Sequence, residues 1–243
     1  MEVDFGKADW DSYALWYDRL NELRPYACML DDVVGYLHSA GSPVLDAGCG
    51  TGNLILRLHE QTTLVGMDAS EAMLARAKEK CAGVLFRCAD LNEGLPFENG
   101  QFGAIACVNT LYALEEPERA LREFFRVLQT DGILVLATPK RGYENGLILK
   151  GHCRSDKPDD YWRGIHRNAE REKSLVHEAI GDPELAEEFL RIVRFNRCIA
   201  AEKSFRFFEE RELRDLVALT GLRIVAHRET YARQSHLLAA RKP

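Results

Sequence analysis

The stretch VLDAGCGTGN at residues 44–53 decides the fold of this 243-residue chain. Two apolar residues lead into Asp46, and glycines follow at every second position from 48 to 52. Glycines in such a turn let the chain reverse tightly and let a ligand approach the backbone. A dinucleotide fingerprint, GxGxxG, would need its last glycine where the chain has Asn53 or Ile55. The spacing therefore argues against NAD, and a plain strand-turn-helix with no ligand is the simpler alternative.

Short apolar runs alternate with helical stretches after this loop. The pattern predicts strands at Val44–Asp46, Thr63–Asp68, Val84–Cys88, Ala104–Val108 and Ile133–Thr138, the last preceded by a turn at Asp131–Gly132. Helices are expected at Asn53–Glu60, from the cap Ser70 to Lys80, and at Pro117–Gln129. Such alternation implies a mostly parallel sheet with helices on both faces, which binds ligands beyond the carboxyl ends of its strands.

Composition narrows the classes of function. The chain is 46% apolar and 29% charged, with a net charge of -6. We see no basic footprint, so a nucleic-acid partner is disfavoured. The opening MEVDFGKADW does not read as a signal peptide, and no apolar run is long enough to span a membrane. Seven scattered cysteines without a CxxC pair favour reduced thiols and a cytoplasmic location.

Five segments in order resemble the class I S-adenosylmethionine-dependent methyltransferases. They are VLDAGCGTGN (44–53), LVGMDAS (64–70), FRCADLNEGLPF (86–97), FGAIACVNTLYAL (102–114) and ALREFFRVLQTDGILVLATP (120–139). The earlier SYALWYDRL (12–20) resembles the helix that precedes the core in small-molecule members such as the ubiquinone and menaquinone group. The resemblance implies S-adenosyl-L-methionine as cofactor and methyl transfer as activity.

The resemblance also implies roles for individual residues. Asp46 would face the amino group of the cofactor, and a charge-assisted hydrogen bond there contributes roughly 1.5–3 kcal/mol. Asp68 would accept from both ribose hydroxyls, and Asp90 from the adenine amino group. The remaining cofactor-binding residues implied by the family pattern are Tyr17, Gly48, Gly50, Ala69, Leu91 and Asn109. For each of these residues the alternative is a structural role without a ligand, in a turn, a helix cap or the packed core.

The expected fold class is α/β, a Rossmann-like seven-stranded methyltransferase sheet with helices on both faces and a helical insertion after the fifth strand. Residues 1–41 would form an N-terminal helical cap and residues 42–140 the S-adenosylmethionine-binding core. Residues 141–203 would form the insertion, as a lid over the acceptor site, with helices at Asn168–Ile180 and from Asp182. Residues 204–243 would add a helix, Phe208–Thr220, and the last two strands, Leu222–Tyr231 and Ser235–Arg241.

A general base is the least defined part of the site. An acceptor that is an alcohol or a protonated amine needs one, and an already acidic acceptor does not. The candidates are His152 and His166 in the insertion, with Tyr112 after the fourth strand; His177 lies within an expected helix. No metal ligand set is apparent, since the strand exits carry Asn109 and Thr138-Pro139-Lys140.

Several functions stay open at this point. The leading hypothesis is methyl transfer to an O, N or C atom of a small-molecule acceptor. Alternatives are a regulatory protein that binds the cofactor without transferring methyl groups, a protein or RNA acceptor, or aminopropyl transfer. Asn109-Thr-Leu-Tyr112 differs from the Asp/Asn-Pro-Pro-aromatic tetrad of enzymes that methylate base amines, which disfavours that class. Oligomeric state and acceptor identity are not specified by the sequence.

Overall fold

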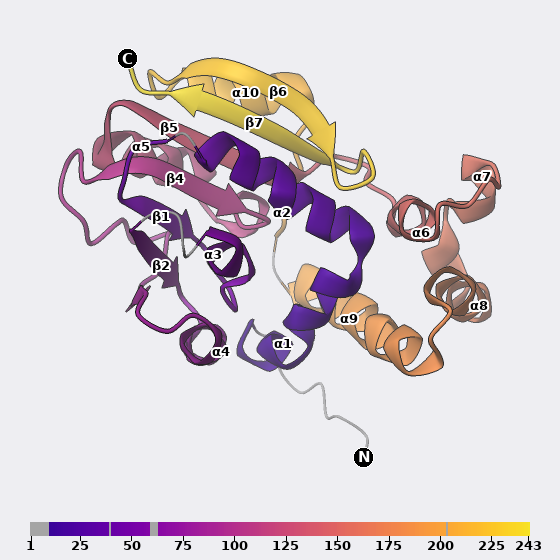
Figure 1. The fold of residues 1–243 in the computed structure, drawn as a ribbon. Helices are drawn as coiled ribbons and strands as arrows, with labels where there is room; N and C mark the ends of the chain where they lie inside the picture. Colours follow the sequence, from indigo (N-terminus) through magenta and orange to yellow (C-terminus); the bar gives the residue numbers. More distant parts are fainter. Residues whose placement is uncertain (1–9, 39, 59–62, 203) are drawn as a thin grey trace.

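A mixed seven-stranded sheet forms the centre of the molecule (Figure 1). The computed structural model describes residues 10–38, 40–58, 63–202 and 204–243. The strands are β1 (Val44–Ala47), β2 (Leu64–Asp68), β3 (Leu85–Cys88), β4 (Phe102–Val108), β5 (Leu128–Pro139), β6 (Arg223–Thr230) and β7 (Ser235–Arg241). Their order is β3-β2-β1-β4-β5-β7-β6, in which only β7 runs antiparallel to both of its neighbours. The expected Rossmann-like class, with its late insertion, is confirmed.

Helices cover both faces of the sheet. They are α1 (Trp10–Tyr17), η1 (Asp18–Glu22), α2 (Arg24–Leu37), α3 (Asn53–Leu58), α4 (Glu71–Lys80), η2 (Leu111–Ala113), α5 (Pro117–Val127), α6 (Asn145–Cys153), α7 (Asp159–Trp162), η3 (Ile165–Arg167), α8 (Ala169–Ile180), α9 (Pro183–Glu202) and α10 (Glu210–Ala218). Buried residues of α2, α3 and α4 form one hydrophobic cluster, and those of α5 and α10 form another. Successive strand residues point to opposite faces of the sheet, so Val44 belongs to the first cluster and Leu45 to the second.

Local chemistry sets several of the helix ends. Ser70 caps α4, because its hydroxyl accepts a hydrogen bond from the amide of Met73 at 3.1 Å. Asn168 caps α8 in the same way, and Gly181 ends that helix in the left-handed conformation that glycine tolerates. Pro25 stands in the first turn of α2, where a missing N–H costs no hydrogen bond.

Two local expectations were wrong. The turn signal Asp131–Gly132 does not precede the strand but lies inside β5, which begins at Leu128. Asp131 does take a positive φ of 63°, and the pairing of β5 with β4 shifts register there, so the turn residues form a bulge within the strand. The strand expected at Val84–Cys88 would be covered on both faces in such a sheet, but Cys88 is exposed, because β3 is the edge of the sheet and has a neighbour on one side alone.

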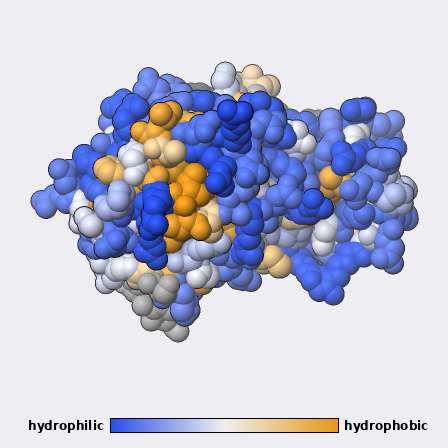
Figure 2. All heavy atoms as spheres, turned by 90° about the horizontal axis from the view of Figure 1, so that it is seen from above, coloured by the Kyte–Doolittle hydropathy of each residue, from blue (hydrophilic) through white to orange (hydrophobic). Residues whose placement is uncertain are grey.

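The chain between β5 and α10 forms the helices α6 to α9, and α6, α7 and α8 lie to one side of the sheet (Figure 1). Helix α9 packs against α8 and α1, so the insertion contacts the N-terminal helix (Figure 1). The surface over α6–α8 is mainly hydrophilic, whereas an apolar area lies over the sheet half of the molecule (Figure 2). Within the described residues, no helix combines the length and apolar character needed to cross a membrane.

Candidate functional site

The glycine loop links β1 to α3 and turns back on the neighbouring strand. Gly48 and Gly50 have φ values of 79° and 52°, in the region that side chains rarely adopt. The amides of Gly48 and Cys49 both donate to the carbonyl of Met67, at 2.8 and 2.9 Å. A Cβ added at Gly50 would lie 3.4 Å from the ring of Tyr17. The missing side chains therefore keep open a cradle between the loop and α1.

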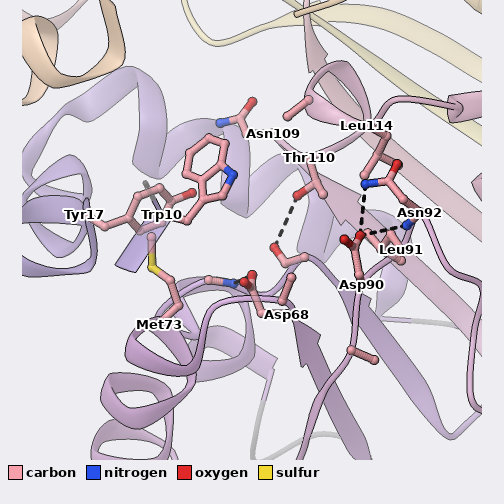
Figure 3. Close-up of a pocket in the computed structure, with 15 residues that line it drawn as sticks. Trp10, Tyr17, Asp68, Met73, Asp90, Leu91, Asn92, Asn109, Thr110 and Leu114 are labelled. Carbon is pink, nitrogen blue, oxygen red and sulfur yellow. Dashed lines mark hydrogen bonds between the residues drawn. The ribbon is translucent and has the colours of Figure 1, made fainter. Parts of the chain in front are cut away.

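A pocket lies directly above this loop (Figure 3). Eight of the residues expected to bind the cofactor line it: Tyr17, Gly48, Gly50, Asp68, Ala69, Asp90, Leu91 and Asn109. The other residues along its wall are Trp10, Met73, Ala89, Asn92, Thr110, Ala113 and Leu114. We call this the loop pocket. The carboxyl ends of β1, β2, β3 and β4 all open toward it, as the parallel topology requires.

Asp68 holds the loop and the next helix together from the end of β2. Its Oδ2 accepts from the amide of Gly50 at 2.8 Å, and its Oδ1 from the amide of Ser70 at 2.9 Å. Burial raises the pKa of Asp68, and the hydrogen bonds from Ser70 and Gly50 offset part of that rise. The side chain borders the loop pocket and presents its carboxylate there (Figure 3).

Asp46 differs from Asp68 because it lies behind the loop rather than in the pocket wall. Its side chain is 2% exposed, and its Oδ2 has no hydrogen-bond partner among the described residues. Burial, followed by the charge of Asp68, raises the pKa of Asp46 to about 7. A buried carboxylate oxygen without a hydrogen-bond donor is costly, and a nearby cationic group would lower that cost.

Asp90 shapes the wall of the loop pocket after β3. Its Oδ1 accepts from the backbone amide of Asn92 at 2.8 Å and from the Asn92 side chain at 3.0 Å. The Asn92 Oδ1 accepts in turn from the amide of Glu115 at 2.9 Å, which joins this turn to the segment after β4. The neighbouring Leu91 is buried and adds an apolar contact surface. A flat heterocycle with exocyclic hydrogen-bonding groups fits such a wall.

Asn109 ends β4 in a strained conformation. Its φ is 50°, which Asn tolerates better than most residues, and its Oδ1 is buried without a partner among the described residues. The next residue, Thr110, donates from its hydroxyl to the carbonyl of Gly48 at 3.3 Å. Strain of this kind concentrates at functional sites, where the surrounding structure enforces it.

A second pocket adjoins the first. We call it the aromatic pocket; its lining residues are Trp10, Tyr13, Tyr17, Leu20, Asn109, Tyr112, Pro139, Tyr143, Asn145, Ile148, Asn196, Phe205, Phe207, Tyr231, Gln234 and Ser235. Three residues, Trp10, Tyr17 and Asn109, line both pockets. The two spaces therefore meet at these three side chains, which Figure 3 shows around the mouth of the loop pocket.

The three candidate bases occupy different places. Tyr112 lines the aromatic pocket, and burial raises its pKa well above the ordinary value, so its phenol stays protonated. His152 lies on α6, where its Nδ1 accepts from the amide of Arg24 at 3.3 Å, and burial lowers its pKa. His166 is exposed in η3. Neither histidine is among the residues that line the loop pocket or the aromatic pocket.

Sequence reasoning missed Trp10 and most of the aromatic pocket. Trp10 lies one helical turn before Tyr13 and two before Tyr17, so the same aromatic stripe contained the signal. No sequence pattern pointed to Phe205, Phe207 and Tyr231, because only the tertiary fold brings their segments to the pocket. Among the described residues, no group of three or more His, Cys, Asp or Glu side chains is placed to hold a metal ion.

Comparisons with known proteins agree with this geometry. The sequence pattern of a methyltransferase domain matches residues 44–132. Demethylmenaquinone methyltransferase of Chlamydia pneumoniae is 33% identical over 176 residues, 65% of this chain and 74% of that protein. Ubiquinone biosynthesis O-methyltransferase of Xanthomonas oryzae pv. oryzae is 28% identical over 57% of this chain and 63% of its own length. The chain spans about half, 49% to 56%, of the length of three further curated relatives.

The fold also matches a solved structure along its full length. Magnesium protoporphyrin IX methyltransferase of Synechocystis PCC 6803, with bound SAH, superposes with a TM-score of 0.59 at 18% identity, over 100% of this chain and 90% of that one. A glycine loop beneath a pocket, with acids at successive strand ends, defines a nucleotide-binding α/β protein. The chain belongs to the class I S-adenosylmethionine-dependent methyltransferases. The unpaired Asp46 oxygen and the loop pocket beside Gly50 fit that cofactor.

Proposed function

We propose that this chain transfers the methyl group of S-adenosylmethionine to a small-molecule acceptor bound in the aromatic pocket. The observation that carries the proposal is the meeting of the two pockets at Trp10, Tyr17 and Asn109. A methyl group presented at that junction faces an acceptor without crossing solvent. The two curated relatives act, by their names, on quinone precursors, which supports a small-molecule acceptor.

In this proposal the acidic residues divide the cofactor among them. Asp46, behind the loop, offsets the charge of the amino group, and Gly48 and Gly50, which line the loop pocket, contact the methionine portion. Asp68 accepts from the ribose hydroxyls. Asp90, with Ala69 and Leu91 beside it, holds the adenine. Each acid thus offers a buried or half-buried carboxylate to a cofactor group that donates a hydrogen bond, and at Asp46 that group is also cationic.

The cofactor would supply a methyl group bonded to its sulfonium sulfur. A lone pair of the acceptor would attack the methyl carbon in line, and the electron pair of the broken C–S bond would stay on sulfur. The protein then has to align and desolvate the acceptor, and alignment alone contributes on the order of 7–11 kcal/mol. Tyr17 and Trp10 provide π faces at the junction, and Asn109 an amide held rigid by its strained backbone. The Tyr112 phenol, kept protonated by burial, positions the acceptor through a hydrogen bond.

A second function competes with the first: a regulatory protein that binds the cofactor without turnover. The aromatic pocket favours it in one respect, because no histidine, aspartate or glutamate is among its described lining residues. An acceptor that is neutral and nucleophilic, or already acidic, removes this objection.

Radiolabelled S-adenosylmethionine incubated with a panel of phenols, amines, thiols and carboxylic acids separates the two functions. Label in an extractable product supports methyl transfer. Calorimetric binding of S-adenosylhomocysteine without turnover on any acceptor would instead support the regulatory function. As a matched variant, Asn109→Ala, which alters the junction, should lower turnover more than it lowers S-adenosylhomocysteine affinity.

A further inference from the structure

The size and charge of the aromatic pocket restrict what it can hold. Its volume is about 110 Å³. An apolar cavity of about 150 Å³ binds benzene, so the smaller aromatic pocket admits at most one ring. The described residues that line it include no aspartate, glutamate, lysine, arginine or histidine. A charged group placed there would lose its hydration without gaining an ion pair, which is unfavourable.

Two of the residues that line this pocket, Asn109 and Ser235, have a buried side-chain oxygen without a partner among the described residues; Asn109 lies at the junction with the loop pocket, and Ser235 lines the aromatic pocket alone. Ser235, the first residue of β7, is 0% exposed and lines the pocket, and its Oγ has no hydrogen-bond partner among the described residues. Antiparallel pairing with Pro139 of β5 and Thr230 of β6 fixes its backbone. A buried hydroxyl that makes no hydrogen bond is costly, and a polar ligand atom within reach would remove that cost.

The neighbouring Gln234 does not share this property. Its Oε1 accepts from the amide of Glu144 at 2.9 Å, and its Nε2 donates to the carbonyl of Ala232 at 3.2 Å. Both ends of the amide are therefore engaged in holding the hairpin against α6. Ser235 differs in that its side chain contributes no such internal bond.

The turn that precedes Ser235 is strained. Tyr231, Ala232 and Arg233 have φ values of 54°, 53° and 65°, three successive residues without a glycine among them. Left-handed conformations of this kind are unfavourable for L-residues and persist only where the surrounding structure enforces them. This turn brings both Tyr231 and Ser235 into the pocket wall. The strain supports a ligand-facing role for this end of the hairpin.

We propose that the aromatic pocket binds an uncharged acceptor of one aromatic ring carrying a hydroxyl group, and that Ser235 is the specificity-determining residue that hydrogen-bonds with it. The ring packs among Tyr13, Tyr112 and Phe205, whose faces line the pocket. This inference rests on the proposed function, because it takes the aromatic pocket to be the acceptor site. It goes further in naming a neutral phenol as the class of acceptor and a β7 hydroxyl as its anchor. Methylation of that phenol would form the O–CH3 bond, break the S–CH3 bond and release the hydroxyl proton to water, because none of the described lining residues is a base.

Four single-ring probes test this, titrated into the full chain saturated with S-adenosylhomocysteine. They are 4-methylphenol, toluene, tyramine as a cation and 4-hydroxyphenylacetate as an anion. We expect 4-methylphenol to bind about three- to tenfold more tightly than toluene, the effect of one neutral hydrogen bond, and both charged probes to bind more weakly than 4-methylphenol. Ser235→Ala should bring the affinity for 4-methylphenol down to that for toluene and leave the toluene affinity unchanged.

Ser174→Ala, on the exposed face of α8, is the matched control and should keep the wild-type preference. The inference is overturned if a charged probe binds as tightly as 4-methylphenol, if no probe binds, or if Ser235→Ala leaves the preference for the phenol intact. Failure of the proposed function would look different. In that case S-adenosylhomocysteine would not bind, or no acceptor would be methylated, while the same probe preference would persist in titrations of the chain alone.

Discussion

Asp68 accepts a hydrogen bond from the backbone amide of Gly50, with 2.8 Å between Oδ2 and N. The residue therefore does two things at once. It fixes the glycine loop to the end of β2, and through the amide of Ser70 it fixes the start of α4. A cofactor whose ribose reaches this carboxylate would find it already oriented, which lowers the cost of ordering on binding.

Asp68→Asn should weaken both functions. The amide keeps one accepting oxygen, so one of the two backbone hydrogen bonds, from Gly50 or from Ser70, is lost together with the charge that a ribose diol favours. We expect the affinity for S-adenosylhomocysteine to fall about 10- to 100-fold, since charge-assisted hydrogen bonds contribute roughly 1.5–3 kcal/mol. The melting temperature should also fall, because a backbone N–H is left facing the amide NH2 without an acceptor. Calorimetry and thermal unfolding measure the two quantities.

Asp160→Asn is the control for that variant, because the Asp160 side chain is 98% exposed and lies outside both pockets. Its affinity and melting temperature should match the wild type. An unchanged affinity in Asp68→Asn would remove Asp68 from the cofactor site and with it the assignment of the ribose position.

The loop pocket was predictable from the sequence because its residues follow strands in short, recognisable segments. Asp68 and Asp90 come directly after β2 and β3, so parallel pairing brings them to one edge of the sheet. The aromatic pocket was not predictable in this way. Trp10 and Ser235 lie 225 positions apart and meet only because β7 inserts beside β5 and α1 packs near the same edge. No local pattern specifies such a meeting.

The raised pKa of Asp46 should appear in the stability of the protein. Its carboxyl has a pKa of about 7 in the folded state, above the 3.8 of the unfolded state. Ionisation therefore disfavours folding, and the loss develops as the pH rises from about 4 to about 7. Asp46→Asn stays neutral throughout. It should exceed the wild type in free energy of unfolding by an amount that grows over this range and then levels off, on the order of 2–4 kcal/mol.

Urea unfolding at pH 4.5, 6 and 8 measures this difference. Asp160→Asn again serves as the reference, and its difference from the wild type should stay near zero at each pH. A stability difference for Asp46→Asn that is flat across the range would show that the carboxyl titrates normally.

Cofactor affinity should also depend on the ionisation of Asp46. Folding favours the protonated carboxyl, whereas cofactor binding favours the ionised carboxylate. A cationic amino group beside Asp46 favours the ionised carboxylate, so binding lowers the pKa from about 7 and releases a proton. The affinity should fall up to tenfold per pH unit below pH 7, where the Asp46 carboxyl is protonated in the free protein. Titrations between pH 6 and 8, in buffers of different ionisation enthalpy, measure both affinity and proton release. In Asp46→Asn, proton release should disappear and the affinity should be low at every pH.

Tyr17 offers a test of the junction between the pockets. Its ring lies over Gly50, and a π face there attracts a sulfonium by roughly 0.5–2 kcal/mol. Tyr17→Phe keeps the face and should bind within about twofold of the wild type. Tyr17→Ala should weaken S-adenosylmethionine more than S-adenosylhomocysteine, whose thioether is neutral. Equal losses for both compounds would indicate packing alone.

Gly48 tests the close approach of the loop to the end of β4. A Cβ at Gly48 would lie 2.2 Å from the Oγ1 of Thr110, whereas one at Gly83 would meet nothing within 4 Å. The two glycines share nearly the same backbone, with φ values of 79° and 81°, so Gly83→Ala measures the conformational cost alone, about 1–2 kcal/mol. Gly48→Ala should lose about 1–3 kcal/mol more by overpacking.

Because Thr110 also lines the loop pocket, Gly48→Ala should weaken cofactor binding as well, while Gly83→Ala should not. The double variant Gly48→Ala/Thr110→Gly removes the three atoms that clash, all of which belong to the Thr110 side chain. The double variant should lose less unfolding free energy than the sum of the losses in the two single variants. The difference, which is the coupling energy, should be about 1–3 kcal/mol. Additive losses in this double-mutant cycle would mean that the contact between loop and strand does not limit the site.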